Sequence, residues 1–223
     1  MRIYLFIHHH HIHLIEPGVE FELYNKAFTD KLPIPEDIKN IEKPIIGYMG
    51  CLDGRSDYGL LEYMANKKPL WSIVFLGPIE VKEERRSLNK YKNVHFLGVK
   101  ERKEELPNYI QMFDVCIIPY RVYDFSKTIY PSKTFEYLAT GKPVVTSYLP
   151  SLDDLAKNNI IKMAKFKEGA FEENYEEFIS LIEDSLNEKD DEAIKRRVEY
   201  AKEASWDSKV ELRLKLIEQL GKL

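Results

Sequence analysis

Hydrophobic runs that end in glycine or in a turn recur along the chain from residue 44 onward. They lie at residues 44–50, 71–77, 93–98, 114–120, 142–147 and 160–164. Most positions in these runs are apolar, without the polar alternation of a half-exposed strand. Such runs are typical of parallel strands that are covered on both faces. The pattern therefore predicts about six buried strands.

Stretches with helical spacing separate these runs. They lie at residues 58–67, 81–91, 103–113, 131–140 and 151–158. Strands that alternate with helices predict an α/β fold, here a doubly wound, Rossmann-like parallel sheet with right-handed crossovers. Further helices are predicted within 175–187 and 190–223. The expected organisation is an N-terminal segment at 1–43, a Rossmann-like domain at 44–187 and extra C-terminal helices at 188–223.

Composition narrows the class of protein. The chain has 223 residues, of which 44% are hydrophobic and 31% charged, as in soluble globular proteins. A formal net charge of -4 gives no basic footprint, so no nucleic-acid partner is expected. Two distant cysteines in apolar surroundings, Cys51 and Cys116, predict reduced thiols and a cytoplasmic location. No run approaches the roughly 18 apolar residues of a membrane-spanning helix.

A histidine tract, His8–His11 followed by His13, stands near the N-terminus. His11 and His13 would share one face of a strand as a chelating pair. Four consecutive histidines cannot all bind one ion, however, and no other ligand has metal-site spacing. We therefore expect no metal site and interpret the tract as tag-like. A strand followed by a turn at Pro17-Gly18 is an equal alternative for this segment.

Ligands of a doubly wound sheet bind beyond the carboxyl ends of its strands. The helix predicted at 131–140 follows such an end. Pro131 suits its first turn, and Ser132 is a candidate cap or first-turn donor. The free N–H groups of a helix start favour an anion, whereas Lys133 in the first turn opposes the helix dipole. A bound phosphate would make that lysine favourable.

A carboxylate at Glu136 lies about 5–6 Å further along the helix axis. That offset is similar to the one between a diphosphate and the hydroxyl groups of its ribose, and a carboxylate suits a vicinal diol. The helix therefore indicates a nucleotide diphosphate ligand. The alternative is that Lys133 and Glu136 are ordinary solvent-facing charges.

Two other strand ends supply candidates. Gly50 permits close approach to a ligand, and Arg55 follows it in a turn where it could face a phosphate. This loop matches neither a Walker loop nor the three-glycine dinucleotide fingerprint. Val99 and the backbone of Lys100 could form a shelf for a base. Ordinary turns with solvated charges remain the alternative for both loops.

Four stretches together carry a family resemblance. They are "PIIGYMGCLDGRSDYGLLEYMA", "WSIVFLGP", "NVHFLGVKERKEELPNY" and the pair "DVCIIPY" and "PSKTFEYLATGKPVVTS", in that order between Pro44 and Ser147. The chain resembles the C-terminal, nucleotide-sugar-binding half of GT-B fold glycosyltransferases, specifically the group 1 (family 4) retaining enzymes. The segment "IEPGVEFELY" at 15–24 also resembles the connection from the N-terminal domain of that family.

The resemblance implies roles for individual residues. Glu136 matches the glutamate that binds the donor ribose, while Ser132 and Lys133 match positions whose backbone amides meet the diphosphate. Thr128 stands where many relatives carry another glutamate that contacts the donor sugar, so sugar handling departs from that pattern.

The remaining matches concern the base and the phosphates. Val99 and Lys100 match the base-binding turn, and Gly50 and Arg55 fall in the loop near the phosphates. The implied substrate is a UDP- or GDP-linked sugar. Neither a separate cofactor nor a metal is expected.

A complete enzyme of this type is about twice as long, so the acceptor domain, or a partner subunit in its place, is expected to be missing. The chain would then be the donor-binding domain of a hexosyltransferase in polysaccharide biosynthesis, inactive alone and at most peripherally bound to membranes. Two alternatives remain. One is a non-catalytic nucleotide-binding subunit of a split enzyme, and the other is a fragment of a GT-B fold nucleotide-sugar epimerase.

Overall fold

A single six-stranded parallel sheet organises the structure, a computed structural model that describes residues 15–124 and 128–220. The strand order is β3-β2-β1-β4-β5-β6. The strands are β1 (Ile45–Met49), β2 (Ser72–Leu76), β3 (Val94–Gly98), β4 (Val115–Ile118), β5 (Val144–Thr146) and β6 (Lys162–Met163). All six predicted strands and the doubly wound Rossmann-like arrangement are thereby confirmed. The histidine tract and His13 lie outside the described residues.

Helices occupy the segments between and after the strands. They are α1 (Phe21–Thr29), α2 (Tyr58–Lys67), α3 (Lys82–Leu88), α4 (Leu106–Ile110), α5 (Lys133–Ala139), α6 (Asp153–Lys157), α7 (Phe171–Leu186), α8 (Asp191–Glu203) and α9 (Trp206–Leu220). Short 3-10 turns precede α4 and α6, at Lys103–Glu105 and Pro150–Leu152. The predicted helices between the strands and the helical C-terminal part are confirmed.

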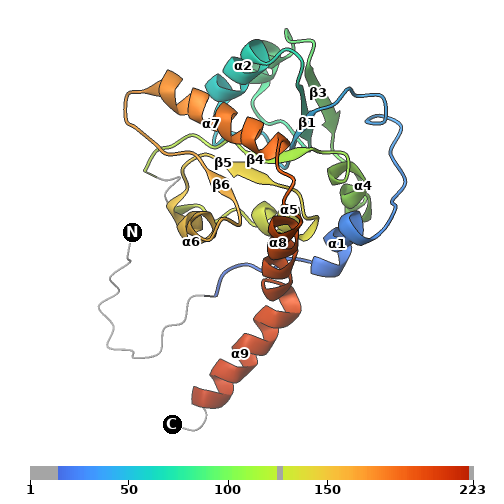
Figure 1. Cartoon of the computed structure of the whole chain (residues 1–223), viewed down its shortest axis with the longest axis vertical. Coiled ribbons are helices and arrows are strands. Elements are labelled where there is room, and N and C mark those ends of the chain that lie inside the picture. The colour runs from blue at the N-terminus through green and yellow to red at the C-terminus, as the bar shows by residue number, and fades with distance from the viewer. Residues whose placement is uncertain (1–14, 125–127, 221–223) are drawn as a thin grey trace.

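The helices form a layer on each face of the sheet (Figure 1). Helices α2, α3 and α7 pack together on one face, whereas α1, α4, α5 and α8 pack together on the other. β1, β2 and β4 are buried at every position, because both of their faces are covered. This burial explains why their sequences show no polar alternation.

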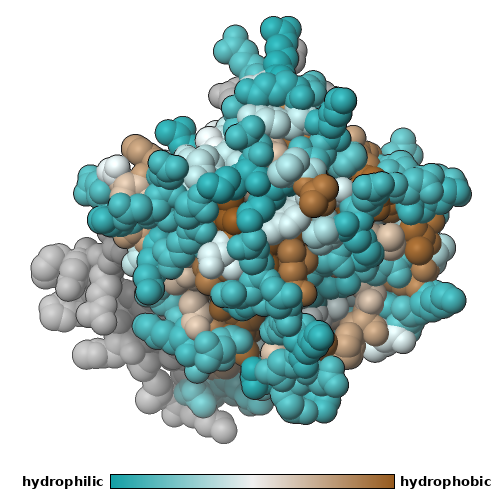
Figure 2. All heavy atoms as spheres, turned by 45° about the horizontal axis from the view of Figure 1, so that its top comes forward, coloured by the Kyte–Doolittle hydropathy of each residue, from teal (hydrophilic) through white to brown (hydrophobic). Residues whose placement is uncertain are grey.

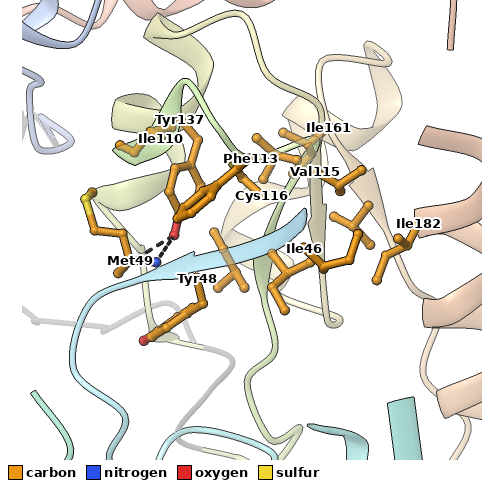
Figure 3. Packing of buried hydrophobic residues seen from close by; sticks show 14 of the residues in the cluster. Ile46, Tyr48, Met49, Ile110, Phe113, Val115, Cys116, Tyr137, Ile161 and Ile182 are labelled. Carbon is orange, nitrogen blue, oxygen red and sulfur yellow. Dashed lines mark hydrogen bonds between the residues drawn. The ribbon is translucent and has the colours of Figure 1, made fainter. Parts of the chain in front are cut away.

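The middle of the core joins β1 to α5. Tyr137 of α5 is fully buried, and its hydroxyl oxygen accepts a hydrogen bond of 2.6 Å from the backbone N–H of Met49 (Figure 3). Gly47 also lies in β1, and the ring of Phe113 packs directly over it. A side chain at position 47 would collide with that ring. These contacts fix α5 against the carboxyl-terminal part of β1.

Helix α1 was not predicted from the sequence. Its buried face presents Phe21 and Tyr24 to α4 and α5. Val19, just before it, pairs with Ser205 at the junction of α8 and α9. Val19 and Ile38 also belong to the same hydrophobic core as the sheet. Residues 15–43 therefore pack onto the Rossmann-like part of the chain.

The face shown in Figure 2 is mostly hydrophilic, with separate hydrophobic areas between the hydrophilic groups. Helix α9 extends away from the rest of the fold and exposes several apolar side chains, among them Leu214 and Ile217. In the described part of the chain, no helix combines the length and the apolar character needed to cross a bilayer.

Candidate functional site

The carboxyl ends of β1 and β4 lie side by side at the point where the strand order reverses direction. This is where open α/β sheets bind their ligands. Gly50 follows β1 with a φ of +141°, a conformation that side chains rarely adopt. A Cβ atom at Gly77 would lie 2.4 Å from the carbonyl oxygen of Gly50. The glycines thus permit β1 and β2 to turn out of the sheet in close contact.

Lys133 reaches this corner from the first turn of α5. Its ammonium group donates hydrogen bonds of 2.9 Å to the Tyr48 hydroxyl and 2.8 Å to the Tyr120 hydroxyl. It also lies over both rings, 4.4 Å and 5.1 Å from their centroids. Within the described residues, no carboxylate forms an ion pair with it. The interpretation of Lys133 as an ordinary solvent-facing charge is therefore wrong.

Arg55 lies in the loop after β1, near the same tyrosine. Its guanidinium carbon is 5.6 Å from the centroid of the Tyr120 ring. Its Nε atom donates to both carboxylate oxygens of Asp53, at 3.0 Å and 2.9 Å. Partial burial raises the pKa of Asp53, but the hydrogen bonds from Arg55 outweigh it and the net shift is downward. Asp53 is thus held as a carboxylate that orients Arg55.

Glu136 lies one helical turn beyond Lys133 on α5 and is covered by α1. The Tyr24 hydroxyl lies close to its carboxylate and interacts with it electrostatically, and Glu20 adds a second negative charge nearby. Burial raises the pKa of Glu136, whereas the positive charge of Lys133 lowers it in part. Glu136 is therefore also not an ordinary solvent-facing charge. It is a partly buried acceptor close to a cation.

The end of β3 carries the residues predicted to meet a base. Val99 is 65% exposed and free to contact a ligand. The Lys100 ammonium instead binds Asp37 at 2.6 Å and lies over the Tyr109 ring of α4, 4.7 Å from its centroid. The side chain of Lys100 is thus tied to the fold, which leaves its backbone for a ligand. β3 is two strands from β1, or about 10 Å across the sheet.

The start of α5 differs from its sequence-based description in one respect. Ser132 occupies the cap position but has helical backbone angles, and its side chain makes no capping hydrogen bond. The prediction that its side chain caps the helix is therefore wrong, and that side chain is exposed. Pro131 is buried beside it, and Thr128 is exposed next to the undescribed residues 125–127.

One group of potential metal ligands includes two residues of the loop that follows β1. Ligand atoms of Cys51, Asp53 and Glu80 are all within 4.8 Å of one another. Asp53 is already paired with Arg55. Burial and the hydrogen bond with Glu80 raise the pKa of the Cys51 thiol, which disfavours the thiolate that a metal needs. We assign no metal to these three residues.

The sequence-based selection missed the two tyrosines that hold Lys133. Tyr48 is the one residue of β1 with a side-chain hydroxyl, and it lies in an otherwise apolar strand. Its hydroxyl donates to the Cys51 carbonyl at 2.9 Å while it accepts from Lys133. A polar tip at the end of a buried strand was a usable signal. The contact between Tyr24 and Glu136 had no comparable signal, because α1 itself was not predicted.

Comparison with known proteins gives a family match over the core of the fold. The family model of the glycosyl transferases group 1 matches residues 44–186. A protein of Bacillus subtilis (strain 168), TuaH, provisionally named as a teichuronic acid biosynthesis glycosyltransferase, is 29% identical over 201 residues. That alignment covers 88% of this chain and 48% of TuaH, so the chain spans about half the length of this curated relative.

Solved structures share the fold at low sequence identity. A sucrose-phosphate synthase from Thermosynechococcus elongatus has a TM-score of 0.65 and 19% identity, with 94% of this chain and 53% of that protein covered. Anabaena HepE in complex with UDP and glucose has a TM-score of 0.61 and 17% identity, with coverages of 92% and 55%. The C-terminal domain of a Francisella tularensis group 1 glycosyl transferase, LpcC, has a TM-score of 0.53 and 15% identity, with coverages of 82% and 93%.

Proposed function

The chain belongs to the group 1 glycosyl transferases, and we propose that it is the donor-binding half of such an enzyme. Its ligand would be a sugar linked to UDP or GDP. The acceptor-binding half would be supplied by a further domain or a partner subunit, in keeping with the half-length match to TuaH. In the complete enzyme a hexose would pass from the donor to an acceptor with retention of configuration.

The observation that carries this proposal is the convergence of two cations on one ring. Lys133 and Arg55 both pack against Tyr120 where β1 and β4 end. Lys133 has no carboxylate partner among the described residues, so an anion would complete its environment. A diphosphate there would receive charge-assisted hydrogen bonds from both side chains and approach the backbone of Gly50.

The rest of the nucleotide would extend from this corner toward β3. Glu136 would accept hydrogen bonds from the two ribose hydroxyls, with Pro131, Ser132 and Thr128 bordering the same side. The backbone of Ser132 and Lys133 would meet the phosphates. Val99 and the Lys100 backbone would support the base, and the separation of β3 from β1 leaves room for the ribose between them. The UDP bound to HepE supports this class of ligand.

The chemical role of the site would be to stabilise the departing diphosphate. Negative charge develops on that group as the bond to the sugar breaks. Cations that are already in place stabilise it without reorganisation, which is the usual source of electrostatic catalysis. Lys133 and Arg55 are held by Tyr48, Tyr120 and Asp53 before any ligand arrives.

Calorimetric titration of the chain with UDP and GDP tests the proposal. We expect binding of at least one of them, and roughly tenfold or greater weakening in Lys133→Met and in Glu136→Ala. Lys195→Met, which removes an exposed lysine of α8, should bind as the wild type does. Absence of heat with both nucleotides at millimolar concentration would reject the proposal. Equal weakening in all three variants would show that the loss is not specific to the site.

A further inference from the structure

A cavity of about 520 Å³ opens at the carboxyl ends of β4, β5 and β6, beside the proposed donor site. Its walls come from the segments after these three strands, from the start of α2 and from α7. None of the nine residues proposed above for the donor lines it. Tyr120, which holds Lys133, borders both regions. The volume of the cavity lies within the range of roughly 300–1,000 Å³ that is usual for small-molecule sites.

Exposed aromatic side chains are part of the lining of this cavity. Tyr123, Phe166 and Phe171 line it and are 41%, 40% and 67% exposed, respectively. They come from three different segments of the chain. Large aromatic groups that gather on a surface without burial mark a binding site more often than scattered ones do. Their faces offer flat apolar area to a ligand that has one apolar side.

Charged groups of both signs line the same cavity, and their formal charges sum to zero. Arg121 and Lys165 are exposed, and neither side chain forms a hydrogen bond or an ion pair with another described residue. Asp57 and Glu168 supply the acceptors. The Oδ1 atom of Asp57 accepts from the Leu60 N–H at 3.0 Å and from the Tyr175 hydroxyl at 3.1 Å. This balance favours a ligand that both donates and accepts hydrogen bonds over a simple anion.

Ser56 adds a buried polar group to the lining. The residue is 0% exposed, and its hydroxyl has no hydrogen-bond partner among the residues that the structure describes. A buried hydroxyl without a partner costs free energy, so a ligand or a water molecule is expected to satisfy it. Ser56 follows Arg55 directly in the chain, and the Arg55 carbonyl accepts a hydrogen bond from the Arg121 N–H at 2.8 Å. The cavity is thus joined to the proposed phosphate corner by one short loop.

We propose that this cavity binds a neutral carbohydrate unit, of the size of a pyranose or a short oligosaccharide, that belongs to the acceptor. Ring sugars present an apolar C–H face to aromatic walls and hydroxyl groups, each a donor and an acceptor, to mixed polar side chains. An acyl chain would leave the four charged groups unpaired, and a small anion would not use the aromatic walls. The assignment to the acceptor rests on the proposed function. The carbohydrate specificity does not.

Saturation-transfer NMR on the full chain tests the inference. The probes are the methyl glycosides of glucose, of N-acetylglucosamine and of glucuronate. We expect transfer to the ring protons of at least one neutral glycoside, at least about fivefold weaker binding in Phe166→Ala, and weaker binding in Ser56→Ala. Ser56→Ala removes only a hydroxyl without a partner, so its melting temperature should not fall. Phe28→Ala, which truncates a ring of similar exposure on α1 (47%), should bind as the wild type does.

Three results would overturn the inference. They are absence of transfer to all three probes, binding of the glucuronate alone, and binding that is unchanged in both Phe166→Ala and Ser56→Ala. Titration of the same samples with UDP separates this inference from the proposed function. Saccharide binding without nucleotide binding would reject the donor site and retain the carbohydrate site. Nucleotide binding without saccharide binding would reject the carbohydrate site and retain the donor site.

Discussion

The Lys133 ammonium lies against Gly50, 83 positions earlier in the chain. A Cβ atom added at Gly50 would lie 2.8 Å from the Lys133 Nζ atom and 3.3 Å from the Tyr48 hydroxyl. Two residues that the sequence indicated separately, one at a strand end and one at a helix start, therefore form a single corner. The absence of a side chain at Gly50 is what makes room for the lysine.

Substitution of Gly50 should destabilise the fold. Gly50→Ala would force an unfavourable backbone conformation and crowd Lys133, so we expect a loss of about 1–3 kcal/mol in the free energy of unfolding. Urea denaturation measures this change. Gly54→Ala is the matched control, because a Cβ atom there meets nothing within 4 Å. Similar losses in both variants would contradict this account of Gly50.

The Tyr137 hydroxyl should contribute to stability through its hydrogen bonds with the backbone of Met49. Tyr137→Phe keeps the ring but leaves the buried Met49 N–H without its acceptor. The expected loss is about 1–3 kcal/mol in the free energy of unfolding. Tyr63→Phe removes a hydroxyl that binds Glu176 near the surface and should change stability by less than about 1 kcal/mol. A larger loss in the control than in Tyr137→Phe would refute this prediction.

Glu136 should make the stability of the free protein depend on pH. Its folded pKa is raised, mainly by burial, so its favourable contribution is present in acid and is lost as the pH rises through that pKa. Glu136→Gln resembles the protonated form at every pH. We therefore expect the variant to be more stable than the wild type at neutral pH and the difference to shrink as the pH falls.

Chemical denaturation at a series of pH values measures this difference. Glu211→Gln, on the exposed face of α9, is the control for the loss of an exposed carboxylate. A difference for Glu136→Gln that is constant with pH would contradict the assigned cause. The same variant should bind UDP more weakly, because an amide accepts hydrogen bonds from the ribose less strongly than a carboxylate does.

Arg197 should be a main attachment of α8 to the fold. It is 4% exposed, donates to the Gly141 carbonyl at 3.0 Å and pairs with Glu188 at 2.9 Å. Arg197→Met would leave the Glu188 carboxylate without its partner, at a cost of about 3–5 kcal/mol. Its neighbour Arg196 forms an exposed pair with Asp190 at 3.5 Å, so Arg196→Met should cost less than about 1 kcal/mol.

Thermal and urea unfolding of the two arginine variants provide the comparison. The double variant Arg197→Met with Glu188→Gln should recover part of the loss, because no unpaired carboxylate remains. A double variant that is less stable than Arg197→Met alone would show that the charge of Glu188 was not the source of the cost.

The local sequence pattern was sufficient to predict the strands, most helices and their order. In β1, β2 and β4 almost every side chain is apolar, and local pattern alone specifies a buried parallel strand. The right-handed crossover then limits how such strands can be arranged. Gly50, Arg55 and Lys133 could be selected for the same reason, since strand ends and helix starts are visible in the sequence.

The contacts that these residues make depend on how the elements pack in three dimensions. No local pattern states that the Lys133 ammonium meets Tyr48 and Tyr120, that Ser132 fails to cap, or that Tyr24 covers Glu136. Each of these facts depends on how close two distant segments pack. Helix α1 is stabilised by burial against α4 and α5. The local sequence of α1 carries no information about these partners, so the helix could not be predicted from it. Sequence therefore specified the elements of this protein, and packing between elements specified the surroundings of its charges.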